Sequence, residues 1–343
     1  MKMKKNKLNN KRIILKNIKK GYHKKIKRNK KKFFRSSPIY IYLYKLLEII
    51  FLIMCLFIFN NKKLKKRKNY IKDSYYSCLL IMAKQENKYI REFVEYYQKI
   101  GLDKIFMADD NWLNTEKLSD VLQDYIEEGF VEIMDVRGKG FTQSHFFKHS
   151  FDIFKSKCKW MLYFDADEFL EFVDKNLTLN DYLSQDNFNK CEVIKVNWVM
   201  YVNEDLLYYD NRPVQERFTK PTHFIDEVRT VKSIVRNDSR RNPWTGSVPH
   251  EPDRGLHSCN SKGDYSPFNY GMIYPPVLSI CYLKHYYYKS AEEFAYKMKK
   301  GFNGNPHPID LKLRLYFQHN KYSKEKVKIF EKIFGRKFNW LNK

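Results

Sequence analysis

The sequence predicts an α/β domain built on an open, mostly parallel sheet with helices on both faces, preceded by a basic tail and a single transmembrane helix. Two observations lead to this prediction. From residue 77 onward, short β-branched or aromatic runs alternate with stretches of helical periodicity, as a parallel sheet with crossover helices requires. Residues 1–72, in contrast, hold 25 Lys and Arg and a single acid, Glu48, and they include a long apolar run.

The first 38 residues form a basic tail. They carry 17 Lys and Arg and no acid. Such a composition cannot bury enough apolar surface to offset the entropy of ordering the chain, so we expect a disordered tail. Its charges suit anionic lipid headgroups, and a Lys- and Asn-rich coding bias is the alternative explanation.

A candidate membrane anchor follows the tail. Residues 39–59 are apolar or Tyr except for Lys45 and Glu48, which lie three residues apart and can pair on one helix face. As a helix, the segment is about 30 Å long, enough to cross a bilayer core. A buried core helix is the alternative, but its two flanks would not normally be strongly basic. We expect a single-pass N-terminal anchor, followed by a basic linker at 60–76.

The charge distribution bears on orientation and on partners. Residues 20–38 hold nine Lys and Arg and residues 60–79 hold seven, so the bias toward a cytoplasmic N-terminus is small and both orientations stay open. Of the net charge of +26, residues 73–343 carry only +2. A nucleic-acid-binding protein that uses the Lys-rich tail is the alternative class, but it would need basic residues spread over a folded face. We therefore expect a membrane, and no nucleic acid, as partner.

Composition limits the class of the remaining chain. With 43% apolar and 17% aromatic residues, the body can bury a full core, which excludes disorder throughout. The six cysteines include no C-x-x-C pair, so neither a zinc ribbon nor a dithiol redox motif is predicted. The redox compartment stays open.

Residues 77–310 are predicted to form the sheet domain, and its first elements alternate regularly. In chain order they are a strand at 78–83, a helix at 86–100, a strand at 104–108, a helix at 115–128, a strand at 130–134, a helix at 142–157 and a strand at 160–164. The helices repeat apolar residues every three to four positions, and Gly101 and Gly129 end the first two as C′ residues. Four strands joined by three helices favour an open, doubly wound sheet.

Beyond residue 174 the alternation breaks down. A strand is predicted at 192–198, and two short ones within 218–236. Residues 242–276 are rich in Pro, Gly, Asn and Ser and predict a loop that holds part of a site. A capping box at residues 290–293 opens a further helix, and residues 311–343 are predicted to form a C-terminal helical extension.

An acidic triplet directly follows the strand at 160–164. Asp165 and Asp167 flank the small Ala166, and Glu168 comes next. In an open α/β sheet, ligands bind at the carboxyl ends of the strands. Three acids this close repel one another unless a cation lies among them, and hard oxygen ligands select Mg²⁺ or Mn²⁺. Such ions share their coordination with phosphate oxygens, which points to a diphosphate-bearing substrate, whereas a solvated acidic turn is the alternative.

These residues resemble a known family. Asp165-Ala-Asp-Glu-Phe169 resembles the D-x-D-E-F motif of glycosyltransferase family 92 and its family-2-like relatives. Further segments resemble the family in the same order, namely Lys84-Gln85-Glu86 with Glu95-Tyr96-Tyr97, Gly101 to Phe106 with Asp109-Asp110-Asn111, Gln215-Glu216-Arg217-Phe218, Val231 to Val235, and Lys284-His285-Tyr286 with Ser290, Glu293 and Phe294. The resemblance covers roughly residues 77–300. It departs from the family at Gln85, where Asn is usual, and at Tyr97 or Gln98, where His is common.

The resemblance implies a GT-A fold and a membrane-anchored, metal-dependent glycosyltransferase. Such an enzyme moves a sugar from a nucleotide-sugar donor to a hydroxyl of a glycan, lipid or protein, and inversion is expected. Asp165 and Asp167 would bind a divalent metal, Mn²⁺ or Mg²⁺, that neutralises the departing nucleoside diphosphate. Lys84, Glu86 and Asp109 would bind the donor near its nucleoside. A nucleotide-sugar hydrolase and an inactive family member are the alternatives, and the intact acidic pair argues against inactivity.

The resemblance also implies a third metal ligand and a general base. In similar enzymes a histidine from the C-terminal part completes the metal shell, and His285 is favoured over His250 because it follows an apolar run. Inverting transfer needs a general base near the acceptor hydroxyl. Glu216 is favoured because the adjacent Arg217, predicted to bind substrate, belongs to a matched element. The other candidates are Asp226, Glu227 and Glu251.

Overall fold

The structure is a computed structural model, which describes residues 75–222, 228–239, 242–244, 254–267, 270–301 and 308–341. The predicted tail at 1–38, the predicted membrane anchor at 39–59 and most of the predicted linker lie outside the described residues. Within the described ranges, no helix is long and apolar enough to cross a membrane.

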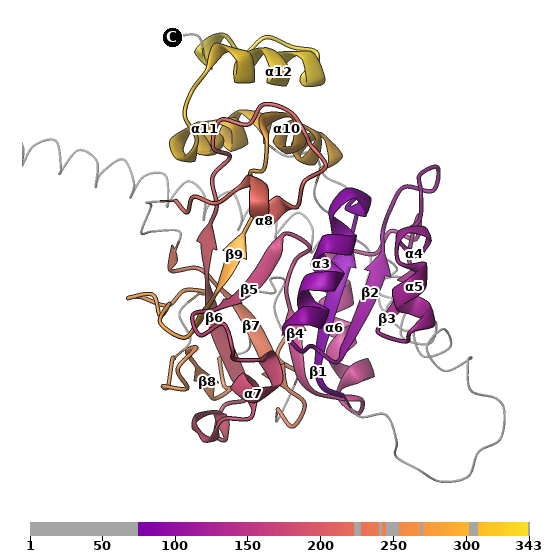
Figure 1. Ribbon diagram of the computed structural model, residues 1–343, viewed down its shortest axis with the longest axis vertical. Helices are drawn as coiled ribbons and strands as arrows, with labels where there is room; N and C mark the ends of the chain where they lie inside the picture. Colours follow the sequence, from indigo (N-terminus) through magenta and orange to yellow (C-terminus); the bar gives the residue numbers. More distant parts are fainter. Residues whose placement is uncertain are drawn as a thin grey trace, which may run out of the picture. The chain divides into compact units, whose positions relative to one another are not determined.

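One mixed sheet organises the described chain (Figure 1). Its strands are β1 (Tyr75–Ala83), β2 (Lys104–Asp109), β3 (Val131–Asp135), β4 (Cys158–Tyr163), β5 (Glu168–Phe172), β6 (Val193–Met200), β7 (Val231–Arg236), β8 (Ser258–Cys259) and β9 (Cys281–His285). They are ordered β3-β2-β1-β4-β7-β6-β9-β5, and β8 pairs with β6. The order places the first four strands, which the sequence predicted, side by side.

The N-terminal half of the sheet is parallel, as predicted. β1 pairs in parallel with β2 and with β4, and β2 pairs in parallel with β3. Ala83 is in register with Asp109, and Asp109 with Asp135, so the carboxyl ends of these strands lie at one edge. Residues that follow the strands therefore meet there.

The C-terminal half is mixed, but β6 is parallel to β8 and β9, so the sheet as a whole is mostly parallel, as predicted. β7 runs antiparallel to both β4 and β6, and β5 runs antiparallel to β9. A short helix, α7 (Leu179–Leu183), lies between β5 and β6 in the chain. The β5–β9 pairing was not predicted, and it sets Glu168 directly opposite His285.

Helices lie at the predicted positions 86–100, 142–157 and after residue 290, whereas the short helices α7 and α8 (Val214–Arg217) were not predicted. The others are α3 (Asn87–Lys99), α4 (Leu118–Val121), α5 (Gln123–Glu127), α6 (Gln143–Phe154), α10 (Ala291–Lys300), α11 (Ile309–His319) and α12 (Lys324–Phe334). The helix predicted at 115–128 is divided into α4 and α5, because Leu122 has φ −118° and leaves the helical conformation. The capping box of α10 is confirmed, since Ser290 and Glu293 each accept the backbone N–H of the other.

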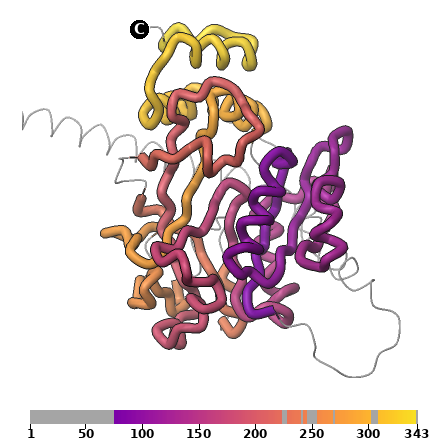
Figure 2. Tube along the Cα trace, viewed as in Figure 1, coloured from indigo at the N-terminus to yellow at the C-terminus, as the bar shows by residue number. Residues whose placement is uncertain are grey.

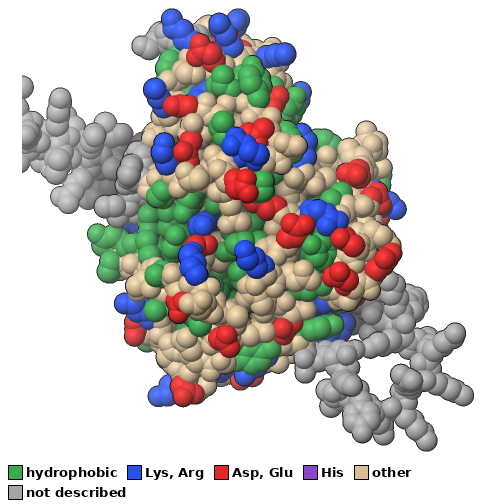
Figure 3. Space-filling model, viewed as in Figure 1, with side chains coloured by type: hydrophobic (Ala, Val, Ile, Leu, Met, Phe, Trp, Pro, Cys, Tyr) green, Lys and Arg blue, Asp and Glu red, His purple; other side chains and the backbone are tan. Residues whose placement is uncertain are grey.

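Among the described residues, two hydrophobic clusters hold the domain together. The larger lies between the sheet and its helices and includes the buried stripe of α3, Ile90, Phe93, Val94 and Tyr97. The smaller joins α10, α11 and α12 around Phe294, Tyr316 and Phe330, and Figure 2 shows these helices together at one end of the trace. On the face drawn in Figure 3, acidic and basic side chains are interspersed, in keeping with the near-neutral body.

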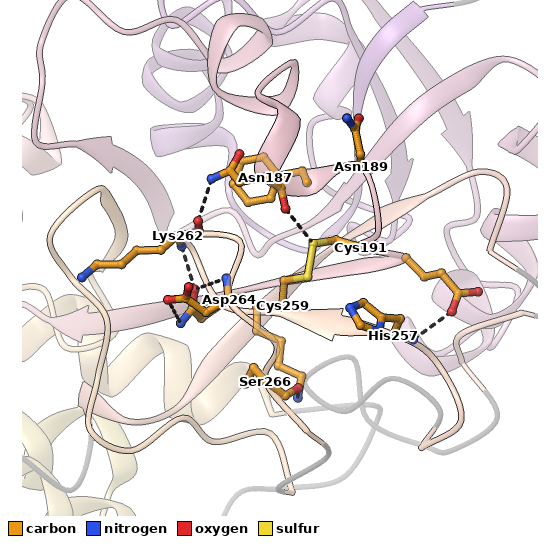
Figure 4. The surroundings of a disulfide bond; sticks show 12 residues. Asn187, Asn189, Cys191, His257, Cys259, Lys262, Asp264 and Ser266 are labelled. Carbon is orange, nitrogen blue, oxygen red and sulfur yellow. Dashed lines mark hydrogen bonds between the residues drawn. A yellow bond between two sulfur atoms is a disulfide. The ribbon is translucent and has the colours of Figure 1, made fainter.

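Two disulfides link segments that are distant in sequence. Cys78 of β1 bonds Cys158 of β4, 80 residues further on. Cys191, just before β6, bonds Cys259 of β8, and the Asn187 side chain donates to the Lys262 carbonyl beside it (Figure 4). The sequence predicted neither bond, because each joins neighbouring strands rather than neighbouring residues.

Candidate active site

A pocket of about 460 Å³ opens at the carboxyl ends of β1, β2 and β4. Five of the predicted site residues line it, namely Lys84, Glu86, Asp165, Asp167 and His285. Lys84 and Glu86 follow β1, the two aspartates follow β4, and His285 ends β9. The topology thus brings together residues that are up to 201 positions apart in the chain.

Asp165 is bound by two side chains. Its Oδ2 lies 2.5 Å from Nζ of Lys232, and its Oδ1 accepts a hydrogen bond of 2.5 Å from the Gln143 amide. Lys232 extends from β7 and is fully buried. Burial would lower the pKa of Lys232, but Asp165 and Glu168 more than offset this effect and raise it. The lysine is therefore a fixed cation beneath the acidic triplet.

Glu168 is buried behind the two aspartates. Its carboxylate accepts the backbone N–H of Asp165 at 2.9 Å and lies 3.3 Å from Lys232. Burial raises the pKa of Glu168 well above its usual value, and Lys232 offsets this only in part. Glu168 thus fixes the turn that presents the aspartates rather than facing the pocket itself.

Asp167 lies between a histidine and a lysine. Its Oδ1 is 3.5 Å from Nε2 of His285, and its Oδ2 is 2.5 Å from Nζ of Lys297 on α10. Burial would raise the pKa of Asp167, but Lys297 and His285 more than offset it, so the pKa lies well below its usual value. Burial lowers the pKa of His285, which Asp167 offsets only in part. At neutral pH the carboxylate is charged and the imidazole is neutral.

Ion pairs also hold the β1 side of the pocket. Lys84 lies 3.0 Å from Asp110, which follows β2. Glu86 lies 2.7 Å from Lys300 and 3.6 Å from Lys289. Burial would raise the pKa of Glu86, but these two ammonium groups more than offset it and lower the pKa. Three lysines of the pocket, Lys84, Lys297 and Lys300, thus already face an acid.

The structure places Asp109 away from the pocket. Its carboxylate accepts backbone N–H groups from Asn111 and Leu118, each at 2.9 Å, and its side chain is buried. Burial raises the pKa of Asp109, and these two hydrogen bonds offset it only in part. Asp109 thus shapes the connection between β2 and α4, and its neighbour Asp110 lines the pocket instead.

Glu216 and Arg217, on α8, do not line the pocket either. Glu216 is exposed. Arg217 is buried and binds Glu293 through two hydrogen bonds of 2.8 and 3.0 Å. Tyr89 donates to the same carboxylate at 2.8 Å, so Arg217 belongs to a structural ion pair. The alternatives His250, Asp226, Glu227 and Glu251 lie outside the described residues.

The predicted ligands have the right chemistry for a divalent cation. Asp165 and Asp167 offer oxygen, His285 offers neutral imidazole nitrogen, and all three line one pocket. Nδ1 of His285 is buried without a hydrogen-bond partner. Each aspartate, however, is already bound by a lysine, and among the described residues no three His, Cys, Asp or Glu side chains form a group that could hold a metal as they stand.

Sequence reasoning missed the lysines that surround the aspartates. Lys232 lies in a segment that matched the family, but nothing in that segment indicates which acid it faces. Lys297 and Lys300 belong to the helix that begins at the predicted capping box, and nothing in its sequence indicates which acids they face. A second pocket, of about 1000 Å³, adjoins the first and shares Glu86, Tyr287, Lys297 and Lys300 with it.

An open α/β sheet with acids and lysines gathered at the carboxyl ends of its strands is typical of the class of α/β proteins that bind a ligand at this edge. Comparison with known families narrows this class. Residues 73–326 match the family model described as Glycosyltransferase family 92, and the chain belongs to this family.

Individual relatives are distant. A glycosyltransferase family 92 protein of Oryza sativa subsp. japonica is 25% identical over 116 residues, which are 34% of this chain and 19% of that protein. The chain thus matches about a fifth of that relative's length. Among solved structures, S. aureus TarS 1-349 in complex with UDP-GlcNAc has a TM-score of 0.30 at 11% identity, covering 76% of this chain and 71% of that one. The mannosyltransferase PcManGT from Pyrobaculum calidifontis, in complex with GDP-Man and Mn²⁺, has a TM-score of 0.26 at 9% identity, covering 44% and 43%.

Proposed function

We propose that the protein is a membrane-anchored, metal-dependent glycosyltransferase. It moves a sugar from a nucleotide-sugar donor to a hydroxyl of a glycan, lipid or protein, with inversion. One observation carries the proposal: in a chain of glycosyltransferase family 92, Asp165 and Asp167 line the same strand-end pocket as Lys84, Lys297 and Lys300. Acids that suit a divalent cation and lysines that suit phosphate are the two requirements of a sugar diphosphate site.

Donor binding is assigned to the β1 side of the pocket. Lys84 and Lys300 bring positive charge to the diphosphate, and Asp110 and Glu86 hold these lysines in place through their ion pairs. Asp109 contributes to donor binding indirectly, because it fixes the loop that carries Asp110.

Asp165, Asp167 and His285 would hold the divalent cation, Mn²⁺ or Mg²⁺. When bound, such an ion offsets the negative charge that develops on the departing nucleoside diphosphate. The buried Glu168 and Lys232 keep the turn between β4 and β5 in one conformation, so the two aspartates face the pocket before any ligand arrives.

The general base is left unassigned among the described residues. Inversion requires a base that takes the proton of the acceptor hydroxyl. Glu216 is exposed on α8 and does not line the pocket, so its position gives no support to that role. Arg217 is likewise better explained by its pair with Glu293 than by substrate binding.

The proposed activity is tested on the purified full-length chain in detergent. With UDP- and GDP-linked sugars, we expect release of the nucleoside diphosphate from at least one donor, its loss after EDTA treatment and its recovery on addition of Mn²⁺. Chromatography of the nucleotides measures the release. If every donor of a broad panel stays intact and unbound, the proposal fails.

The disulfides support an assignment of compartment. Disulfides persist in oxidising compartments and are rare in the cytosol. We therefore propose that the segment at 39–59 anchors the chain with its N-terminus in the cytosol and its catalytic body on the oxidising side. This orientation agrees with the small excess of Lys and Arg before the segment.

The cysteine oxidation state provides the corresponding prediction. When membranes that contain the full chain are denatured in an alkylating reagent without reductant, the reagent should label Cys281, which is free and buried in the fold. It should leave Cys78, Cys158, Cys191 and Cys259 unlabelled. Peptide mass spectrometry measures both sets in one sample, so Cys281 serves as the internal control. Label on Cys78 and Cys158 would place the body in a reducing compartment.

A further inference from the structure

Lys297 is placed where both pockets and the acidic triplet meet. It lies in the last turns of α10, and its Nζ is 2.5 Å from Oδ2 of Asp167. The ammonium also lies over the ring of Tyr287, 4.0 Å from its centroid. Its side chain lines both pockets and keeps 22% exposure. Lys297 thus holds the very carboxylate that the proposed cation would need.

The two lysines that bind the acidic triplet, Lys232 and Lys297, differ in how freely their side chains can move. Lys232 has no exposed side-chain surface and lies within 3.3 Å of both Asp165 and Glu168, so it is fixed between two acids. Lys297 has one close acidic partner, Asp167, and its contact with the Tyr287 carbonyl oxygen is 3.4 Å long. A lysine side chain on a four-carbon stem that borders a pocket can turn into that pocket.

A divalent cation and the Lys297 ammonium compete for Asp167. Like charges a few ångströms apart in a buried site repel strongly. A cation at Asp167 would therefore displace Lys297, and an ammonium left without an anion in a largely buried site is unfavourable. The nearest acids on the β1 side, Asp110 and Glu86, already face Lys84 and Lys300. An arriving diphosphate is an anion that a displaced Lys297 can bind.

We propose that Lys297 is an exchangeable cation, which holds Asp167 in the empty protein and moves to the donor diphosphate when a divalent cation takes its place. This inference rests on the proposed function for the identity of the donor. The exchange breaks one ion pair and forms another, and no covalent bond changes. Because the same side chain links both ligands, metal and nucleotide must strengthen each other's binding by one common factor.

Removal of the Lys297 charge should affect the two ligands in opposite directions. In Lys297→Met nothing competes for Asp167, so Mn²⁺ alone should bind about tenfold more tightly than to the wild type. The diphosphate loses its partner, so the gain in Mn²⁺ affinity that UDP or GDP produces should shrink by about tenfold. If Lys297 had only a structural role, its substitution would weaken the binding of both ligands or of neither.

The test measures Mn²⁺ binding to the full-length protein, with and without UDP or GDP, from the electron paramagnetic resonance signal of free Mn²⁺. Formation of the Mn²⁺–nucleotide complex is measured without protein and subtracted. Lys297→Arg, which keeps the charge, should retain weak Mn²⁺ binding, and Lys328→Met, an exposed lysine of α12, is the matched control. Thermal unfolding verifies that each variant is folded.

The outcomes separate this inference from the proposed activity. If folded Lys297→Met binds Mn²⁺ alone with wild-type affinity, or if the wild type binds no Mn²⁺, the exchange is refuted even when sugar transfer is observed. If the opposite shifts appear in a protein that transfers no sugar, the exchange stands and the proposed activity falls.

Discussion

Replacement of Asp167 by Asn is expected to lower sugar transfer about a thousandfold, because stabilisation of the departing charge is worth several kcal/mol. Asp167 is the carboxylate that His285 and Lys297 both face, and its side chain is 10% exposed within the pocket. The amide keeps the size of the side chain but loses its charge, so the proposed cation is held less well. The rate of nucleoside diphosphate release at saturating donor measures the loss.

The matched control for this variant is Asp186→Asn, at an exposed position in the turn after α7. It should turn over donor at the wild-type rate and unfold at the wild-type temperature. A rate for Asp167→Asn within about threefold of the wild type would contradict the assignment of the acidic pair to the chemistry. Thermal unfolding of both variants separates loss of the site from loss of the fold.

Local patterns predicted the parallel half of the fold. The strands and helices from β1 to β4 are each specified by their own periodicity, and right-handed crossovers leave few ways to assemble them. The mixed half depends on pairings between distant segments, such as Glu168 opposite His285, which no local pattern encodes. The disulfides were not predicted for the same reason. Cys78 and Cys158, for example, become neighbours only when β1 and β4 pair.

The candidate site was predictable to the extent that its residues follow strands. Asp165 and Asp167 were found because they end an apolar run, and His285 because a family motif marks it. The sequence did not show which of Asp109 and Asp110 faces the pocket. Neighbouring residues of an extended segment point in opposite directions, and only Asp110 lines the pocket. Lys297 and Lys300 were missed because a lysine on an amphipathic helix is expected to be exposed to solvent until its acidic partner is known.

The second large effect is expected at Arg217, where stability rather than catalysis should change. Arg217 and Glu293 have side-chain exposures of 1% and 4%, and removal of one partner from a buried ion pair costs about 3 to 5 kcal/mol. Arg217→Met should therefore lower the unfolding temperature by about 10 °C. Arg212→Met is the control, because Arg212 pairs with Asp210 at the surface with 56% exposure and should cost about 1 kcal/mol or less.

The pH dependence of the stability difference between the wild type and Arg217→Met identifies the cause of that difference. Burial would raise the pKa of Glu293, but Arg217 and Ser290 more than offset it and lower the pKa from its ordinary 4.5. The stability that the pair contributes is thus present above about pH 4.5 and is lost as the pH falls through the lower folded-state pKa. In Arg217→Met the buried carboxyl group lacks its partner and its pKa rises, so the stability gap between the two proteins should narrow on acidification. A gap that stays constant with pH would contradict the ion pair as its cause. A weakened affinity for donor with unchanged stability would instead support the sequence-based prediction that Arg217 binds substrate.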